Sequence, residues 1–396
     1  MRVPYALSVY DSKEENRVLS VMREHRTNMG VETREFESRV ASYFGKKYGI
    51  MVNSGSSANL LAVELLDLPK GSEVITPILT FATTVAPLVQ KGLVPVFADV
   101  EEGKYVINVS QIESLITKKT KALMIPLLLG NVPNLPKIKQ IAKKHNLLFV
   151  EDSCDTLGAT LRGTPTGKFS DISTTSFFGA HVITAGGNGG MVMVNSEKLR
   201  DRAKVLRAWG RSSALFGETE DIGKRFKGRL GTLPYDAKFI FDEVGYNLLP
   251  MEMSAAFGNA QLDKLDRFRK NRERNFSRLL KFFKKYERFF ISPIQNPASK
   301  TQWITFPLTI RKNAPFSRIE LVTFLEEHNI QTRPIFTGNI LSQPGFKKIP
   351  HRSMKGGFPM ADAVMERGFV IGCHHGLTSK HLNWMEKVIG DFLKRL

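Results

Sequence analysis

The segment 176–190 (SFFGAHVITAGGNGG) places a histidine between an apolar run and a group of glycines, a pattern that suits chemistry on a bound ligand. The apolar run ends at Phe178, and four glycines follow within residues 186–190. Glycines permit positive φ angles and close approach of the backbone to a ligand. An isolated histidine is more often a hydrogen-bonded structural residue. The break between a buried strand and a Gly-rich loop nevertheless favours a catalytic His181.

Two further segments have residue types that could bind a ligand. Residues 54–59 (SGSSAN) follow a predicted strand and begin an apolar helical pattern, so the turn would direct backbone N–H groups toward a phosphate. Many helices begin with Ser and Gly only as caps, so this motif is weak by itself. Asp152 directly follows the run 147–151 (LLFVE) and is either a capping residue or a ligand-binding group at the carboxyl end of a strand.

The elements that must position these residues alternate between apolar strands and helices through the first half of the chain. Such alternation predicts an α/β fold with a mainly parallel sheet that is covered by helices on both faces. The polar stretch 211–238 has weak periodicity, and we expect it to be a long functional or interface loop. A basic amphipathic helix within residues 264–288 follows it.

Beyond that helix the chain shows the pattern of a smaller α+β region. Two strand candidates lie at 303–310 and 333–336, and two helix candidates lie near 317–328 and 380–395. We therefore predict two intertwined domains. The N-terminal segment and the large domain comprise residues 1–255, and the long helix and small domain comprise residues 256–396.

Composition argues against several other classes of protein. The formal net charge of +19 over 396 residues could indicate nucleic acid or a membrane surface, but the basic residues form no separate tail or binding module. No apolar run is long enough to span a bilayer, and the first residues lack the pattern of a secretory signal, so we expect a cytoplasmic chain. The chain has two cysteines, Cys154 and Cys373, which excludes a four-cysteine site within one chain. His374 and His375 are adjacent and therefore lack the helical spacing of metal ligands. We expect no metal.

Taken together, the turn at 54–59, Asp152 and the segment 176–190 resemble a fold-type-I pyridoxal-phosphate (PLP) enzyme. More narrowly, the chain is similar to the sugar-nucleotide aminotransferases of the DegT/DnrJ/EryC1/StrS family. Matching stretches run along nearly the whole chain, and their combination is specific although no single stretch is; they include SGSSANLLA, VEDSCDTLGA, RAWGR, GKRF, VGYNLLPMEMSAA and TRPIFTGNILSQP.

The resemblance makes His181 the most informative residue, because that position is normally the lysine that forms the internal Schiff base with the cofactor. Histidine there is similar to the branch of the family that removes the C3 hydroxyl of nucleotide-linked 4-keto-6-deoxyhexoses. The iron-sulfur members of this branch carry cysteines in the segment that corresponds to 209–224, which has none here, so no cluster is expected. Gly179 and Asn188 depart from the proline and the acidic residue that are usual in this loop.

The resemblance also implies roles for particular residues. The cofactor phosphate would be held by Gly55, Ser56 and Ser176, Phe81 would lie on the ring face, and Asp152 would pair with the pyridine nitrogen with Asp155 nearby. Asn247 would reach the phosphate of a neighbouring subunit in a homodimer with active sites at the interface. Because planar guanidinium groups suit diphosphates, Arg211 and Arg333 are candidates for binding the sugar nucleotide, together with Asn339.

The implied activity is dehydration at C3 of a nucleotide-linked 4-keto-6-deoxyhexose. It would use non-covalently bound PLP and pyridoxamine phosphate (PMP), with glutamate as the amine donor and ammonia as a product. The expected substrate is GDP-4-keto-6-deoxymannose. Two alternatives remain open, a dehydratase of CDP-4-keto-6-deoxyglucose that needs an external reductase and a catalytically silent homologue that binds sugar nucleotides.

Overall fold

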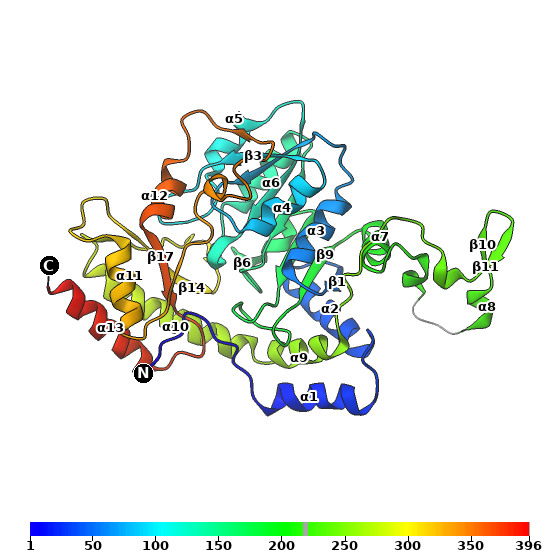
Figure 1. Cartoon of the computed structure of the whole chain (residues 1–396), viewed down its shortest axis with the longest axis horizontal. Coiled ribbons are helices and arrows are strands. Elements are labelled where there is room, and N and C mark those ends of the chain that lie inside the picture. Colours follow the sequence, from blue (N-terminus) through cyan, green and yellow to red (C-terminus); the bar gives the residue numbers. More distant parts are fainter. Residues whose placement is uncertain (217–220, 396) are drawn as a thin grey trace.

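The computed structural model describes residues 1–216 and 221–395, and a central eight-stranded sheet dominates it (Figure 1). The strand order is β1-β9-β8-β5-β4-β2-β3-β16. The neighbours from β8 to β16 pair in parallel, and β9 runs antiparallel to both β1 and β8. The predicted mainly parallel sheet is therefore confirmed. Its strands are β1 (Tyr48–Val52), β2 (Glu73–Pro77), β3 (Val94–Ala98), β4 (Thr120–Pro126), β5 (Leu148–Asp152), β8 (Ile172–Ser176), β9 (Gly190–Val194) and β16 (Arg352–Ser353).

Helices cover both faces of this sheet because successive strand residues point to opposite sides. In β2, Val74 packs into one apolar cluster with α3 and α7, whereas Ile75 packs into another with α6. In β5, Val150 packs into the first of these clusters and Phe149 into the second. The helices of this part are α1 (Ser12–Arg23), α2 (Val31–Tyr43), α3 (Gly55–Leu65), α4 (Ala82–Gln90), α5 (Ile112–Leu115), α6 (Leu135–Lys144) and α7 (Glu197–Arg207).

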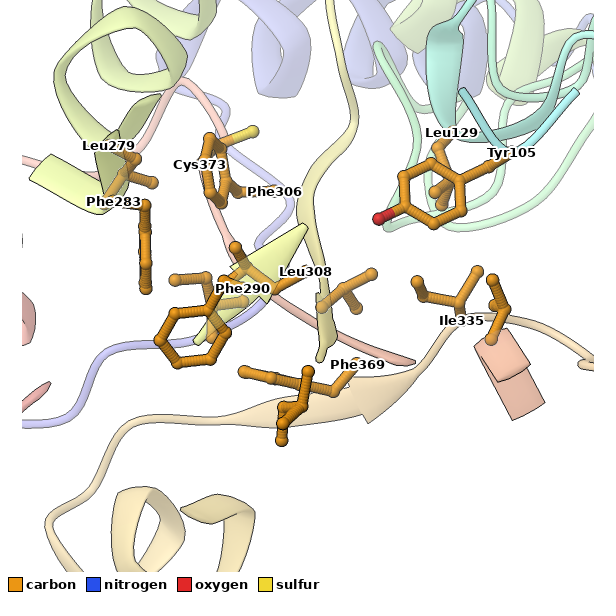
Figure 2. Close-up of a cluster of buried hydrophobic side chains, with 14 of the residues drawn as sticks. Tyr105, Leu129, Leu279, Phe283, Phe290, Phe306, Leu308, Ile335, Phe369 and Cys373 are labelled. Carbon is orange, nitrogen blue, oxygen red and sulfur yellow. The ribbon is translucent and has the colours of Figure 1, made fainter. Parts of the chain in front are cut away.

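The C-terminal region is built on a second, antiparallel sheet with the order β12-β14-β17-β15. The long helix α10 packs aromatic and aliphatic side chains, including Phe283, against Phe290, Phe306 and Phe369 of this sheet (Figure 2). The strands are β12 (Phe290–Ile291), β14 (Thr305–Ile310), β15 (Thr332–Pro334) and β17 (Gly368–Gly372), and the helices are α10 (Leu265–Lys284), α11 (Arg318–Glu327), α12 (Pro359–Arg367) and α13 (Ser379–Leu393). A small third sheet joins β6 (Thr160–Leu161), β7 (Thr164–Pro165) and β13 (Ser299–Lys300).

The two parts of the chain exchange segments. Val3 pairs with Ile330 of the C-terminal region, and β16 returns from that region to the edge of the large sheet. The predicted boundary at 255/256 falls within helix α9 (Glu252–Leu262), which is followed almost directly by α10. The division into two domains stays a prediction, and these crossings fit its intertwined character.

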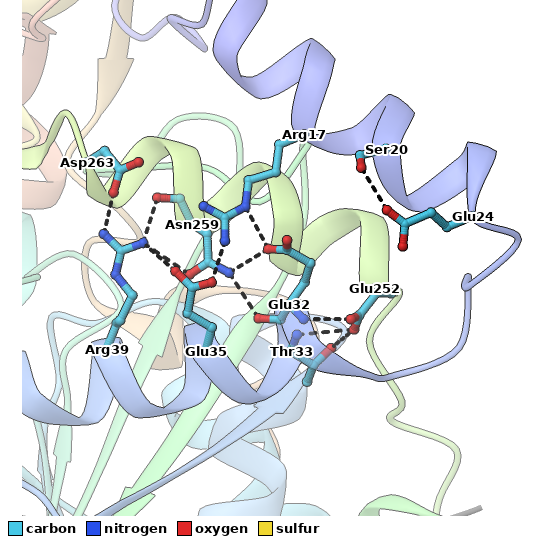
Figure 3. A network of polar contacts seen from close by, with 10 residues as sticks. All are labelled: Arg17, Ser20, Glu24, Glu32, Thr33, Glu35, Arg39, Glu252, Asn259 and Asp263. Atoms are coloured by element: carbon cyan, nitrogen blue, oxygen red, sulfur yellow. Dashed lines mark hydrogen bonds and ion pairs between the residues drawn. The ribbon is translucent and has the colours of Figure 1, made fainter.

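A polar network fixes the layer of helices on which α10 begins (Figure 3). The Glu252 carboxylate of α9 accepts hydrogen bonds from the backbone N–H groups of Gly30, Glu32 and Thr33, which satisfies the free N-terminal donors of α2. Arg39 of α2 donates to Asn259 and to Asp263 at the end of α9. Helix α9 is thereby held against α2, and α10 starts from a fixed position.

Residues 209–216 and 221–250 form an arm, most of which extends from the body of the molecule (Figure 1), while Leu248 near its end packs into the core of the large sheet. The arm carries α8 (Ile222–Arg225) and a hairpin of β10 (Gly228–Leu230) and β11 (Leu233–Tyr235). Most of the stretch predicted as a long loop lies here, and residues 217–220 of it lie outside the described residues. Large apolar side chains of the arm are exposed, among them Ile222, Phe226, Leu233, Phe239, Phe241 and Val244. Among the described helices, none has the length and hydropathy of a membrane span.

Candidate active site

A cavity of about 520 Å³ lies at the carboxyl ends of strands β4, β5 and β8, where parallel sheets place their ligand sites. Tyr5 of the N-terminal segment and Ile304, Thr305 and Phe336 of the C-terminal region close it from other sides. Seven of the residues predicted from the sequence line this one cavity: Gly55, Ser56, Phe81, Asp152, Asp155, Ser176 and His181.

The N-terminus of α3 opens into the cavity. Ser54 caps this helix by accepting a hydrogen bond from the Ser57 N–H. Gly55 lies so close to the end of β8 that a Cβ atom there would approach the Cβ atom of Ser176 to 2.5 Å. The first N–H groups of a helix have no intrahelical acceptor and lie at the positive end of its dipole. This end of the cavity is therefore suited to an anionic group such as a phosphate.

Asp152 ends strand β5 and is held in one orientation by neighbouring side chains. Its Oδ2 accepts hydrogen bonds from Asn59 Nδ2 and Thr84 Oγ1, both at 2.8 Å, and its Oδ1 accepts from the Cys154 N–H at 3.2 Å. Asn59 is oriented in turn because its Oδ1 accepts from Thr174 Oγ1 at 2.6 Å. The carboxylate is thus a preorganised acceptor at the cavity wall rather than a helix cap.

His181 and Asp155 face each other across 3.8 Å, from Nε2 to Oδ1. Burial lowers the pKa of His181 to about 4, and burial raises the pKa of Asp155 to about 7 with Asp152 acting in the same direction. Asp155 Oδ2 also accepts a hydrogen bond from the Leu129 N–H at 2.8 Å. At neutral pH the imidazole is therefore uncharged.

The backbone around His181 is shaped by the Gly-rich loop. The Phe177 N–H donates to the Gly189 carbonyl, the Gly179 N–H donates to the Gly187 carbonyl, and the φ of Gly187 is 109°, which favours glycine. The His181 N–H donates to the Phe178 carbonyl, and the His181 carbonyl accepts from Arg272. Its Nδ1 is buried and has no hydrogen-bond partner among the described residues. The imidazole lies at the wall of the cavity.

Four predicted site residues do not line the cavity of their own chain: Asn247, Arg211, Arg333 and Asn339. Asn247 and Arg211 lie on the arm, where the Arg211 guanidinium stacks on Trp209. Asn339 is buried, and its side chain donates to Asp362 and accepts from the Leu341 N–H. The Arg333 guanidinium lies 4.6 Å from the centre of the Tyr5 ring, so it borders a residue that does line the cavity.

Several residues of the site escaped the sequence analysis. Asn59 lies one helical turn after Gly55, and its position within the SGSSAN motif was an available signal. Arg272 occupies the apolar stripe of α10, where a charged residue breaks the pattern, and this too was a signal. Tyr5 and Thr84 come from segments with no chemical motif, so only the tertiary structure reveals them.

The pKa of Asp155 predicts a pH-dependent effect on stability. Because its folded pKa of about 7 exceeds the ordinary 3.8, the stability it contributes is complete below about pH 4 and is lost as pH rises through 7. Asp155→Asn removes this titration. The cofactor-free variant should be more stable than wild type at pH 8, by as much as about 4 kcal/mol, and the difference should shrink toward pH 4.

Urea unfolding at pH 5 and pH 8 measures this difference. Glu327→Gln, at an exposed carboxyl on α11, is the control and should show no such pH dependence. If the difference in unfolding free energy between Asp155→Asn and wild type did not grow between pH 5 and pH 8, the raised pKa of Asp155 would be contradicted.

Comparison with known proteins agrees with this geometry. The chain is 39% identical over 98% of its length to dTDP-4-dehydro-2,6-dideoxy-D-glucose 3-dehydratase of Saccharopolyspora spinosa, of which 86% is covered. It is 33% identical to GDP-4-keto-6-deoxy-D-mannose 3-dehydratase of Yersinia pseudotuberculosis, with 94% of each chain covered. The structure of the E. coli GDP-4-keto-6-deoxy-D-mannose 3-dehydratase with bound hydrated PLP matches with a TM-score of 0.87 at 29% identity, covering 98% of this chain and 100% of that one.

The fold is that of fold-type-I PLP enzymes, as the sequence predicts. A family model matches residues 9–389, which is nearly the whole described chain. The chain belongs to the DegT/DnrJ/EryC1/StrS aminotransferase family.

Proposed function

We propose that the protein is a PMP-dependent sugar-nucleotide 3-dehydratase, a lyase that removes the C3 hydroxyl of a nucleotide-linked 4-keto-6-deoxyhexose. The observation that carries this proposal is the uncharged, buried imidazole of His181 in the cavity, where other members of the family are expected to have lysine. Imidazole cannot form a covalent imine with a cofactor, but it can accept and return a proton. The similarity to two sugar-nucleotide 3-dehydratases supports the same conclusion.

The cavity fits PLP or PMP bound without a covalent tie. The α3 N-terminus with Gly55, Ser56 and Ser176 would hold the phosphate, Asp152 would keep the ring nitrogen protonated, and Phe81 would cover one ring face. Bound as PMP, the cofactor supplies an amine for the C4 ketone, an acidic methylene and a ring that accepts electrons. The preorganised Asp152 carboxylate and the His181 imidazole at the cavity wall are the structural features that favour this fit.

His181 would move one proton during the reaction. Its neutral imidazole is ready to accept a proton at physiological pH, because the pKa lies near 4. Burial makes the resulting imidazolium a stronger acid than an exposed one, which favours transfer of its proton to the departing C3 hydroxyl. The hydroxyl then leaves as water. Asp155, 3.8 Å away, would limit the orientations that the ring can adopt.

The overall reaction balances without an external reductant. The sugar loses one oxygen atom, and glutamate becomes 2-oxoglutarate and ammonia, so glutamate supplies the two electrons. The absence of cysteine between residues 209 and 224 is consistent with this scheme, because a cluster of the iron-sulfur type would need thiolates there. We propose GDP-4-keto-6-deoxymannose as the substrate. The 39% identity to a dTDP-sugar dehydratase also favours the dTDP-linked sugar as a second candidate.

The sugar nucleotide would extend from the cavity toward charged residues at its border. Arg333 is proposed as a diphosphate ligand because its guanidinium is already ordered on the Tyr5 ring beside the cavity. Asn339 would need to exchange its hydrogen bond with Asp362 to reach the substrate. Arg211 lies on the arm and would act from a neighbouring copy.

We further propose a homodimer in which the arm reaches the active site of the second copy. The exposed apolar side chains of residues 209–250 form a surface that a partner would cover. Asn247, which the resemblance assigns to the cofactor phosphate, lies at the base of this arm and does not line the cavity of its own chain. A site completed by the partner explains both observations.

Mass spectrometry of the sugar product tests the reaction. GDP-4-keto-6-deoxymannose, or dTDP-4-dehydro-2,6-dideoxy-D-glucose, is incubated with protein, PLP and glutamate in the absence of any reductant. The expected product has lost one oxygen atom, with equimolar 2-oxoglutarate and ammonia. His181→Gln should lower the rate by about 10²- to 10⁴-fold, the usual contribution of general acid–base catalysis, while it still binds PLP. An aminated sugar would identify an aminotransferase, and no product from either sugar would overturn the proposal.

The molar mass in solution tests the dimer. We expect light scattering to show that the wild type is a dimer. Combining Ile222→Asp with Phe226→Asp on the arm should raise the dissociation constant of the dimer by about tenfold or more. Ile319→Asp is the matched control, because Ile319 and Ile222 are both 68% exposed and Ile319 lies on α11. A monomeric wild type, or equal effects of the arm variant and the control, would argue against this interface.

A further inference from the structure

Arg272 is a fully buried arginine on the apolar face of α10. Its residue is 1% exposed, and it lies one turn after Phe268 and one turn before Phe276. No carboxylate pairs with it in the described ranges 1–216 and 221–395, and burial lowers its pKa to about 10. Burying a charge without a counter-ion opposes folding. A residue of this kind therefore needs an explanation other than stability.

The guanidinium of Arg272 joins two walls of the cavity. Its Nη2 donates to the carbonyl oxygen of His181 at 2.9 Å, and its Nη1 donates to the carbonyl oxygen of Ile304 at 3.0 Å. His181 belongs to the Gly-rich loop of the large sheet, whereas Ile304 directly precedes β14 of the small one, and both residues line the cavity. The planar fork of arginine can make both bonds at once, which the single ammonium group of lysine cannot do with the same geometry.

Arg272 also contributes to the electrostatic surroundings of the imidazole. The carboxyl groups of Asp152 and Asp155, the thiol of Cys154 and the Arg272 guanidinium are the titratable or charged groups around His181. Burial is the main cause of the lowered pKa of His181, the backbone of Ser176 and the carboxylate of Asp152 act to raise this pKa, and the positive charge of Arg272 acts with burial to lower it. The guanidinium thus favours the neutral imidazole.

We propose that Arg272 is a positioning residue that fixes the His181 backbone and ties it to the opposite cavity wall. The inference rests on the proposed function only for the role of His181 as the group that carries the proton. Loss of the fork would let the His181 loop shift, and a displacement of about 1 Å at a reacting group can lower a rate by about 100-fold. Loss of the charge would additionally favour the imidazolium.

Two substitutions separate these two contributions. Arg272→Lys keeps the charge and most of the aliphatic stem but loses the fork, so kcat should fall by about 10- to 100-fold with little change in KM and an unmoved acidic limb of the pH profile. Arg272→Gln loses the charge as well, so the acidic limb of kcat/KM should move to higher pH. Arg278→Lys is the matched control, because Arg278 lies on the same helix but pairs with Glu386 at the surface.

The second readout is an NMR titration of ¹⁵N-labelled histidine in the cofactor-free protein, with His181 assigned from the His181→Gln variant. Arg272→Gln should raise the His181 midpoint, and Arg272→Lys should change its resonance position without moving the midpoint. Asn275→Ala is the control for the loss of a buried polar side chain, because Asn275 lies in the same buried stripe of α10 but donates to the His374 carbonyl. The His181 titration of this variant should match that of wild type.

Unchanged kcat and an unchanged His181 titration in both Arg272 variants would overturn the proposal. Equal changes of the His181 titration in Asn275→Ala and in the Arg272 variants would also overturn the proposal, because they would indicate a general loosening of the core. If Arg272→Gln does not fold, Arg272→Lys alone decides through its kcat and its His181 resonance. The titration needs no substrate, so a protein that dehydrates neither sugar but shows these NMR changes would refute the proposed function and leave the link between Arg272 and His181 standing.

Discussion

Burial of the His181 imidazole beside Asp155 is the constraint on which the rest of the site depends. In water at neutral pH the aspartate would be ionised and the histidine partly protonated, whereas burial shifts the pKa of each group so that its uncharged form is favoured. The surrounding elements maintain this state. Strand β5 brings Asp152 and Asp155 to one edge of the sheet, the Gly-rich loop bends His181 toward them, and the C-terminal region covers the remaining side.

Much of this arrangement could be predicted from the sequence because it depends on local patterns. Apolar strands that alternate with helices define a parallel sheet, and the rule that ligands lie at its carboxyl ends brings residues 54–59, Asp152 and His181 together. Strand β2 and helix α6 belong to this alternation of apolar strands and helices. Strand β17 was not identified, although it lies at the centre of the small sheet, because it stands alone after α12 and not within a repeated alternation of strands and helices.

Features that depend on long-range contacts could not be predicted in the same way. The pKa of His181 depends on burial by residues as distant in sequence as Arg272, and no local sequence pattern indicates that burial. Arg211, a predicted substrate ligand, and Asn247, a predicted ligand of the cofactor phosphate, lie on an arm whose position only the tertiary structure reveals. The stretch that contains most of this arm has a polar composition, and only the structure reveals that several of its apolar side chains, such as Ile222 and Phe226, are exposed.

The central claim is that the protein keeps its cofactor without a covalent bond, with the neutral base His181 in the position of the expected lysine. Hydride reduction of the PLP-loaded protein, followed by intact-mass spectrometry of the denatured chain, tests this claim most directly. The wild-type chain should retain the mass of the polypeptide alone, and a His181→Lys chain should gain the mass of one reduced cofactor. A wild-type chain that gained the cofactor mass would contradict the account.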